Sequence, residues 1–192
     1  MLHKKRIIVV ITGTPGTGKT TLARGLSRRL GGTLLNINDI ILSNKLYTGK
    51  DEFGTRIVDL VKLRKKLLEM INSSSGTLVL DSHLLSDIVI EGHCNAMVYA
   101  IVLRLHLKPL LKRLIARNYP DAKIKDNIVS EALGYCSRMA RERYSNVIEI
   151  ESGRGALSMA MKELEKAHVR TRELDYGNEL LWIIRKHPEY AI

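Results

Sequence analysis

Residues 13–21 are Gly13-Thr14-Pro15-Gly16-Thr17-Gly18-Lys19-Thr20-Thr21, which fits the pattern G-x-x-x-x-G-K-S/T without a gap. Residues 6–12 before it form a mostly β-branched apolar run, which is typical of a buried parallel strand. After it, Leu22, Leu26 and Leu30 recur every four residues and predict an amphipathic helix. A strand, a glycine turn and a helix in this order predict a cradle for phosphate groups.

The residue types of this stretch suit that role. The three glycines, at positions 13, 16 and 18, let the backbone turn tightly with its N–H groups pointing inward, and the new helix adds its positive end. Lys19 would reach the β- and γ-phosphates, and the hydroxyl of Thr20 would bind Mg²⁺. A glycine-rich turn that binds nothing is the alternative, but spacing, Lys-Thr ending and flanks all favour nucleoside triphosphate binding.

Length and composition predict one globular, soluble domain with a short appendage. The chain has 192 residues, of which 45% are hydrophobic and 27% charged. No apolar run approaches the ~20 residues that span a bilayer, so we expect no membrane association. Residues 1–6 lead directly into the first strand, so we expect no signal peptide. Cys94 and Cys136 lie far apart, which favours reduced thiols in a cytoplasmic protein over a disulfide or metal site.

The net charge of +11 and the pI near 9.8 indicate anionic partners beyond one nucleotide. RNA or ribonucleoprotein is one such partner. A basic protein without a nucleic-acid partner is equally compatible with charge alone.

Apolar patterns along the chain predict an α/β fold, a five-stranded parallel sheet flanked by helices. Further strands are expected at 33–37, 77–80, 97–103 and 146–150, and helices at 40–44, 60–71, 107–117 and 156–167. Residues 45–59 are expected to be rich in loops, and a helical stripe runs from Ile124 to Met139. The short apolar run Leu180–Ile184 must be buried, either on the parent domain or on a partner.

The strand at 77–80 ends in Asp81-Ser82-His83. A carboxylate at the carboxyl end of a central parallel strand faces the same crevice as the glycine loop, where Asp81 would hold Mg²⁺ through water. The alternative is a helix N-cap, a common place for Asp. His83 could position or polarise an attacking water or steer the phosphoryl group, or it could be a hydrogen-bonded bystander.

Arginines cluster beside a break between two helical patterns. Arg113 and Arg117 lie one helical turn apart, just before the break at residues 118–121. Because guanidinium groups neutralise the charge of a transferring phosphoryl group, this arrangement predicts a closing lid with Arg117 in a functional role. A later group is interpreted as a solvated basic face or an RNA surface: Arg138, Arg141 and Arg143.

Over about residues 6–165 the sequence resembles the family of small archaeal adenylate kinases related to eukaryotic adenylate kinase isoenzyme six. Besides the glycine loop, the resemblance rests on Asn36-Ile37-Asn38-Asp39, Leu46-Tyr47, Ile57-Val58-Asp59, Asp81-Ser82-His83, Val102-Leu103-Arg104, Arg113 to Tyr119, and Asp126-Asn127-Ile128 with Glu131. The glycine loop alone fits many families. The ordered combination, with Asp-x-His after a strand and Arg-x-Tyr opening the lid, is much more specific.

The resemblance implies a P-loop nucleoside monophosphate kinase fold, with a kinase domain at 1–167 and an extension with a short helix at 168–192. Within the domain, 36–59 would bind the monophosphate and 117–127 would be the lid. It implies the reaction ATP + AMP = 2 ADP with Mg²⁺, together with ATP hydrolysis. It also implies a role in maturation of the small ribosomal subunit, with a small-subunit ribosomal protein and rRNA as partners. A nucleotide-switched assembly ATPase with little kinase activity is the alternative.

On this basis each site residue has an expected role. The catalytic set is Lys19, Asp81, His83 and Arg117, and the metal ligands are Thr20 and Asp81. ATP would be bound by Gly13, Gly16, Thr17, Gly18, Lys19, Thr20, Thr21, Arg117 and Arg154.

The sequence departs from the family pattern in three places. Many nucleoside monophosphate kinases have an arginine in the first helix of the monophosphate site, and residues 40–44 contain none, so Arg56 is the candidate substitute. Asn118 stands where the family usually has glycine, and Asn also tolerates unusual backbone angles. The segment after Ala167 matches weakly.

Overall fold

The computed structural model describes residues 6–51, 54 and 56–190. Residues 1–5, on which our expectation about a signal peptide rests, lie outside the described residues. Within the described part no helix combines the length and apolar character that crossing a membrane requires.

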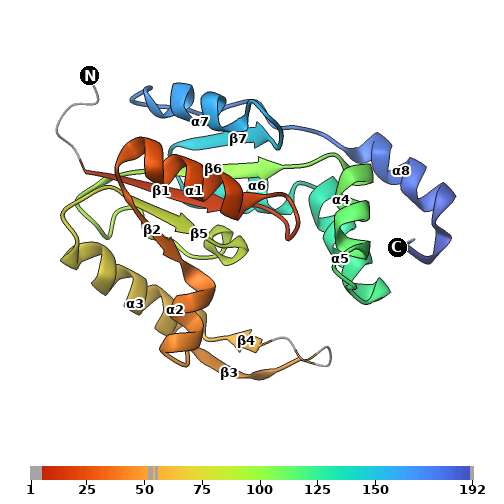
Figure 1. Ribbon diagram of the computed structural model, residues 1–192, viewed down its shortest axis with the longest axis horizontal. Helices are drawn as coiled ribbons and strands as arrows, with labels where there is room; N and C mark the ends of the chain where they lie inside the picture. Colours follow the sequence, from red (N-terminus) through yellow and green to blue (C-terminus); the bar gives the residue numbers. More distant parts are fainter. Residues whose placement is uncertain (1–5, 52–53, 55, 191–192) are drawn as a thin grey trace.

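Five parallel strands form the main sheet of the described chain, in the order β2-β5-β1-β6-β7 (Figure 1). These are β2 (Thr33–Asn36), β5 (Leu78–Asp81), β1 (Ile7–Thr12), β6 (Met97–Arg104) and β7 (Val147–Glu151). The predicted α/β class is confirmed. Ile11 pairs with Asp81, and Thr12 with Val102, so the glycine loop that follows β1 leaves the sheet beside the carboxyl ends of both neighbouring strands.

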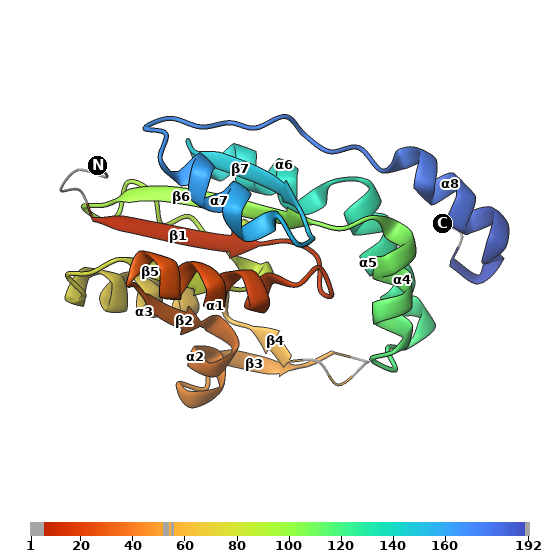
Figure 2. The same ribbon diagram turned by 45° about the horizontal axis from the view of Figure 1, so that its top comes forward.

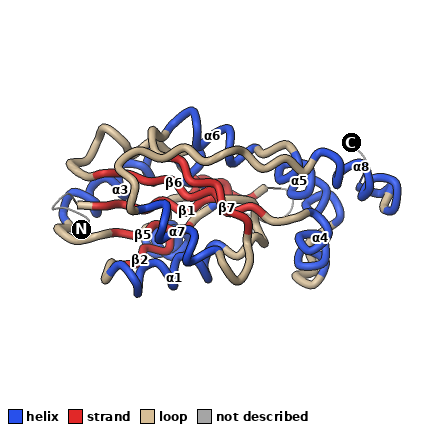
Figure 3. The backbone as a smooth tube through the Cα atoms, turned by 90° about the horizontal axis from the view of Figure 1, so that it is seen from above, coloured by secondary structure: helices blue, strands red, loops and turns tan. Residues whose placement is uncertain are grey.

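Helices cover both faces of the sheet because the central strands are apolar on both sides. Val9 and Ile11 of β1 pack with α1 (Lys19–Leu30) and α7 (Ala156–Leu164). Ile8 and Val10 face the other layer, made by α2 (Ile37–Ser43), α3 (Leu60–Ser73) and α6 (Tyr135–Arg143). Figure 3 shows α1 and α6 on opposite sides of the strands.

The segment 45–59, which we expected to be rich in loops, contains an antiparallel hairpin of β3 (Tyr47–Lys50) and β4 (Arg56–Val58). These strands are four and three residues long and mostly exposed, so they carry no apolar alternation that a sequence pattern could reveal. The preceding α2 begins earlier than predicted, because Asn36 caps it by accepting a hydrogen bond from the backbone N–H of Asn38.

Two helices, not one, carry the apolar stripe between Ile124 and Met139. α5 (Asp121–Ala132) ends before Gly134, whose φ of +62° no continuous helix allows, and α6 follows. The chain also breaks between α4 (Leu107–Ile115) and α5. There Asn118 has a φ of +53°, a left-handed conformation that asparagine tolerates, as we expected. The short helix η1 (His83–Ser86) follows β5.

The C-terminal segment packs on the parent domain. Helix α8 (Gly177–Lys186) and the turn η2 (Pro188–Tyr190) place Leu180, Ile183 and Tyr190 in one apolar cluster with Leu114 of α4 and Ile128 of α5. Figure 2 shows α8 beside α4 and α5, beyond the carboxyl ends of the strands. We left open whether residues 180–184 are buried on the parent domain or on a partner. In the structure they pack on the parent domain.

Candidate active site

The glycine loop after β1 adopts a conformation that its sequence requires. Gly13, Gly16 and Gly18 have φ values of +137°, +98° and +104°. A Cβ at Gly13 would lie 2.4 Å from the backbone oxygen of Leu103, so only glycine fits there. The loop therefore packs tightly against the end of β6 and leads directly into α1.

Lys19 lies across the loop. Its Nζ donates to the backbone oxygens of Gly13 and Thr14, at 2.8 and 3.0 Å. Burial lowers the pKa of Lys19, although the charge of Asp81 opposes this. A polyphosphate in the loop would supply the counter-charge that this buried ammonium group needs.

Asp81 faces the loop from the end of β5. The hydroxyl of Thr20 donates to its Oδ2 at 2.7 Å, and Asp81 is 5% exposed. The N-cap of η1 is Ser82, whose side chain accepts from the N–H of Leu84, so the alternative role for Asp81 is taken by its neighbour. A hydroxyl and a carboxylate in contact are the hard oxygen donors that suit Mg²⁺, so this pair fits the metal we expect.

Two cavities meet at the loop. The larger, of about 680 Å³, is lined by Lys19, Asp81, His83 and Arg117, so the structure brings the four predicted catalytic residues together. The second, of about 540 Å³, is lined by Gly16, Thr21, Arg117 and Arg154. Arg117 lines both cavities. Among the predicted ATP ligands, Gly13 and Thr17 are buried and line neither cavity.

His83 opens the helix η1, which is fixed to β1 because the hydroxyl of Thr12 donates to the His83 carbonyl at 3.2 Å. His83 lines the larger cavity. Desolvation by the surrounding protein, and then the positive charge of Lys19, lower the pKa of His83 to about 4. The imidazole is therefore neutral at neutral pH, which suits a group that accepts a hydrogen bond.

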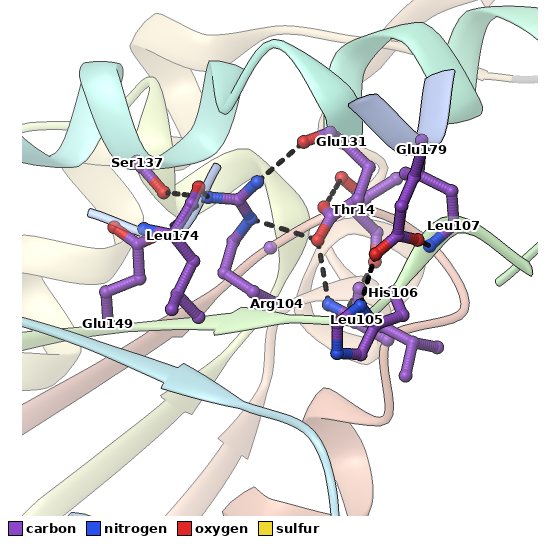
Figure 4. A network of polar contacts seen from close by, with 12 residues as sticks. Thr14, Arg104, Leu105, His106, Leu107, Glu131, Ser137, Glu149, Leu174 and Glu179 are labelled. Atoms are coloured by element: carbon purple, nitrogen blue, oxygen red, sulfur yellow. Dashed lines mark hydrogen bonds and ion pairs between the residues drawn. The ribbon is translucent and has the colours of Figure 1, made fainter. Parts of the chain in front are cut away.

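A buried network connects the loop to α5 (Figure 4). The Thr14 hydroxyl donates to Glu131 Oε2 at 2.5 Å, and Glu131 Oε1 lies 3.0 Å from Nε of Arg104. Arg104, at the end of β6, is fully buried, and its Nη1 lies 2.5 Å from Oε1 of Glu149. Burial favours the neutral form of Arg104, but the two carboxylates outweigh it and raise its pKa. The guanidinium group of Arg104 thus joins β6 to β7 and α5, and Glu131 of α5 extends the network to the loop.

The C-terminal segment joins the same network. Arg104 donates to the Leu174 carbonyl at 3.0 Å, and its guanidinium carbon lies 4.9 Å from the ring centre of Tyr176. Glu179 accepts from the N–H of Leu107 at 2.8 Å, at the first residue of α4. Glu179 also contacts Nδ1 of His106 (Figure 4). The extension therefore fixes the base of the helix that leads to Arg117.

Comparison with known proteins identifies the family. Residues 9–134 match the family model described as an AAA domain. A Methanocaldococcus jannaschii protein named "Putative adenylate kinase" is 36% identical over 129 residues, which cover 67% of this chain and 68% of that protein. A Caenorhabditis elegans protein named "Adenylate kinase isoenzyme 6 homolog" is 32% identical over 146 residues, 76% of this chain and 78% of that protein. The chain belongs to this adenylate kinase family.

Solved structures share the fold of this family member. Shikimate kinase from Acinetobacter baumannii has a TM-score of 0.56 at 18% identity, with 84% of this chain and 92% of that chain covered. A sugar kinase from a Janibacter species has a TM-score of 0.59 at 16% identity, with coverage of 85% and 96%. At such identities the likeness shows the P-loop kinase fold alone.

The expected substitute for the arginine absent from α2 is not at the site of this family member. Arg56 lies on the exposed strand β4, with its guanidinium carbon 5.2 Å from the ring centre of Tyr47. Among the described residues, the linings of the two cavities do not include Arg56. Arg56 therefore lines neither cavity in this structure, and its role as the substitute stays a prediction.

Arg113 is a site residue that we did not predict from the sequence, although its spacing from Arg117 is one helical turn. Its Nη1 donates to the carbonyl of Gly16 at 2.9 Å and lies 3.4 Å from that of Thr17. Arg113 thus holds the glycine loop from α4.

Arg141, interpreted as part of a solvated face, is only 20% exposed in its side chain and lies 3.3 Å from Glu149.

Proposed function

We propose that the protein is a nucleoside monophosphate kinase that catalyses ATP + AMP = 2 ADP with Mg²⁺ and also hydrolyses ATP. The observation that carries the proposal is the convergence of Lys19, the Thr20–Asp81 pair and Arg117 at the junction of two cavities. One cavity for each nucleotide, with the phosphate-binding groups between them, is what transfer between two nucleotides requires. The names of the family's relatives support AMP as the acceptor.

In this mechanism the loop and Lys19 hold the β- and γ-phosphates of ATP, and Thr20 and Asp81 hold Mg²⁺, which neutralises phosphate charge when bound. An oxygen of the AMP phosphate attacks the γ-phosphorus in line. The bond from that phosphorus to the β-phosphate oxygen breaks, and ADP leaves. Arg117 faces both cavities and so neutralises the charge of the group in transit. In hydrolysis, water attacks the γ-phosphorus in place of AMP and the same bond to the β-phosphate oxygen breaks. The neutral imidazole of His83 accepts a hydrogen bond from this water, one of whose protons stays on the phosphate product while the other is released to solvent.

A coupled assay of ADP formation from ATP and AMP tests this function. We expect the wild-type protein to form ADP, and the Lys19→Ala variant to lose at least about 100-fold of the rate, since removing one donor to developing charge typically costs that much. ADP formation by the wild type no faster than by Lys19→Ala would contradict the proposal.

A second candidate is an ATPase that switches binding to the small ribosomal subunit. The net charge of +11 and the absence of an arginine from α2 favour it. Binding of a small-subunit ribosomal protein and rRNA should then depend on the nucleotide present and fall as salt rises. Pull-down at several salt concentrations tests this, and binding that ignores both variables would contradict it. We place either activity in the cytoplasm, with which Cys94 and Cys136 are compatible, because neither forms a disulfide in the described part of the chain.

A further inference from the structure

Among the described residues, the side of the larger cavity next to β2 has no cation of its own. The described residues of 36–59 that line it are Asn36, Asn38 and Asp51. Helix α2 instead buries its apolar residues Ile37, Ile40 and Ile41 in the core. A monophosphate carries up to two negative charges at neutral pH, so the acceptor must find its counter-charge elsewhere.

The two cavities distinguish the donor side from the acceptor side. The second cavity runs from the loop to Arg154 and Leu157 at the start of α7, which suits the nucleoside part of ATP. The larger cavity lies between the end of β5, Asn36 and α5, on the other side of Lys19. Arg117 lines both, as a group facing the transferred phosphoryl should, so it does not belong to the acceptor alone.

The described cations that line the larger cavity are Lys19, Arg117 and Lys123. Lys123 lies in the first turn of α5 and, among the described residues, lines this cavity and not the second. The Nζ lies 4.8 Å from the ring centre of Tyr119, a cation–π contact on the cavity wall.

We propose that the ammonium group of Lys123 binds the phosphate of the acceptor nucleotide, in place of an arginine on α2. This inference rests on the proposed kinase function and deepens it. Because Lys123 stands on α5, directly after the break at 118–120, acceptor binding would draw the lid toward the cavity. Acceptor affinity would then be set by the lid and not by the segment 36–59.

The chain supplies a matched control. Lys125 stands two residues later on the same helix and has the same charge, but it lines a neighbouring cavity with Leu133 and Arg138, and not the larger one. Lys123→Met and Lys125→Met therefore remove equal charge from one helix turn. Circular dichroism of both variants checks that each folds.

The test varies AMP at saturating Mg²⁺-ATP, and then ATP at saturating AMP. Losing a hydrogen bond to a charged group corresponds to about 10- to 100-fold in affinity, so Lys123→Met should raise the KM for AMP by that factor. The KM for ATP should change less than about twofold in the same variant, Lys123→Arg should restore the KM for AMP to within a few-fold, and Lys125→Met should match wild type.

An unchanged KM for AMP in Lys123→Met, an equal rise in both KM values, or the same rise in Lys125→Met would each overturn the inference. Calorimetric titration with AMP alone separates this from the proposed function. A wild-type protein that forms no ADP but binds AMP through Lys123 would contradict the function and support the site. A wild-type protein that binds no AMP would overturn both.

Discussion

Replacement of Arg104 by methionine should destabilise the protein strongly. Breaking a buried ion pair by removing one partner typically costs about 3–5 kcal/mol, because the other charge stays buried. Arg104 faces two carboxylates, and the side chains of Arg104, Glu131 and Glu149 are at most 1% exposed. Each carboxylate keeps another donor, the N–H of Leu105 or of Leu174, both at 2.8 Å, so the two losses do not simply add.

We therefore expect Arg104→Met to lower the free energy of unfolding by at least about 3 kcal/mol, out of a total of about 5–15 kcal/mol for a domain. Urea unfolding followed by circular dichroism measures this. The exposed Arg138 offers a control, since Arg138→Met should stay within about 0.5 kcal/mol of wild type. Adding Glu131→Gln to Arg104→Met should recover part of the loss, because Glu149 keeps the Arg141 guanidinium at 3.3 Å, whereas the described ion pair of Glu131 is with Arg104. A loss below about 1 kcal/mol in Arg104→Met would refute the reasoning.

Three further predictions concern titration and the loop. The hydrogen bond with Glu179, and the nearby carboxylate charges, raise the pKa of His106. Its stabilisation is therefore complete below its unfolded pKa and is lost as pH rises through the folded value. Between pH 5.5 and 9 the free energy of unfolding of the wild type, measured with urea, should fall by up to about 1 kcal/mol more than that of His106→Asn. An equal pH dependence in the two proteins would contradict this. His83, with its pKa near 4, should keep neutral imidazole NMR shifts from pH 8 down to pH 5; a midpoint between 6 and 7 would disprove this. Gly13→Ala should abolish Mg²⁺-ATP binding, whereas Gly76→Ala, with open space around its Cβ, should bind as wild type does in calorimetry; retained binding in Gly13→Ala would argue against the loop geometry.

The features that could be predicted were those that a short stretch of sequence determines by itself. The apolar runs at 6–12 and 97–103 each had enough length to show a buried strand, and the glycine spacing marked the loop. The hairpin at 47–58 was missed because its strands are short and mostly exposed. The break at Gly134 was missed because apolar residues keep helical spacing on both sides of it, so periodicity alone cannot show that a left-handed residue intervenes.

The site was predictable only in part for a similar reason. Asp81 could be placed beside the loop because parallel strands end at a common edge. The partnership of Thr14 with Glu131 joins residues 117 positions apart, and that of Arg104 with Glu149 joins residues 45 apart. No spacing rule reaches across such separations. The role of Arg113 depends in the same way on how α4 packs on the loop, which only the assembled fold defines.

The central claim is that the loop at 13–20 encloses the phosphates of ATP, with Asp81 facing the metal. Calorimetric titration of the protein with ATP, with and without Mg²⁺, tests it most directly. We predict saturable binding with Mg²⁺, weaker by at least about tenfold in Lys19→Ala and, with Mg²⁺ present, in Asp81→Asn, since each substitution removes a charged partner. Wild-type protein that takes up no Mg²⁺-ATP, or that binds it equally well after both substitutions, would contradict the account.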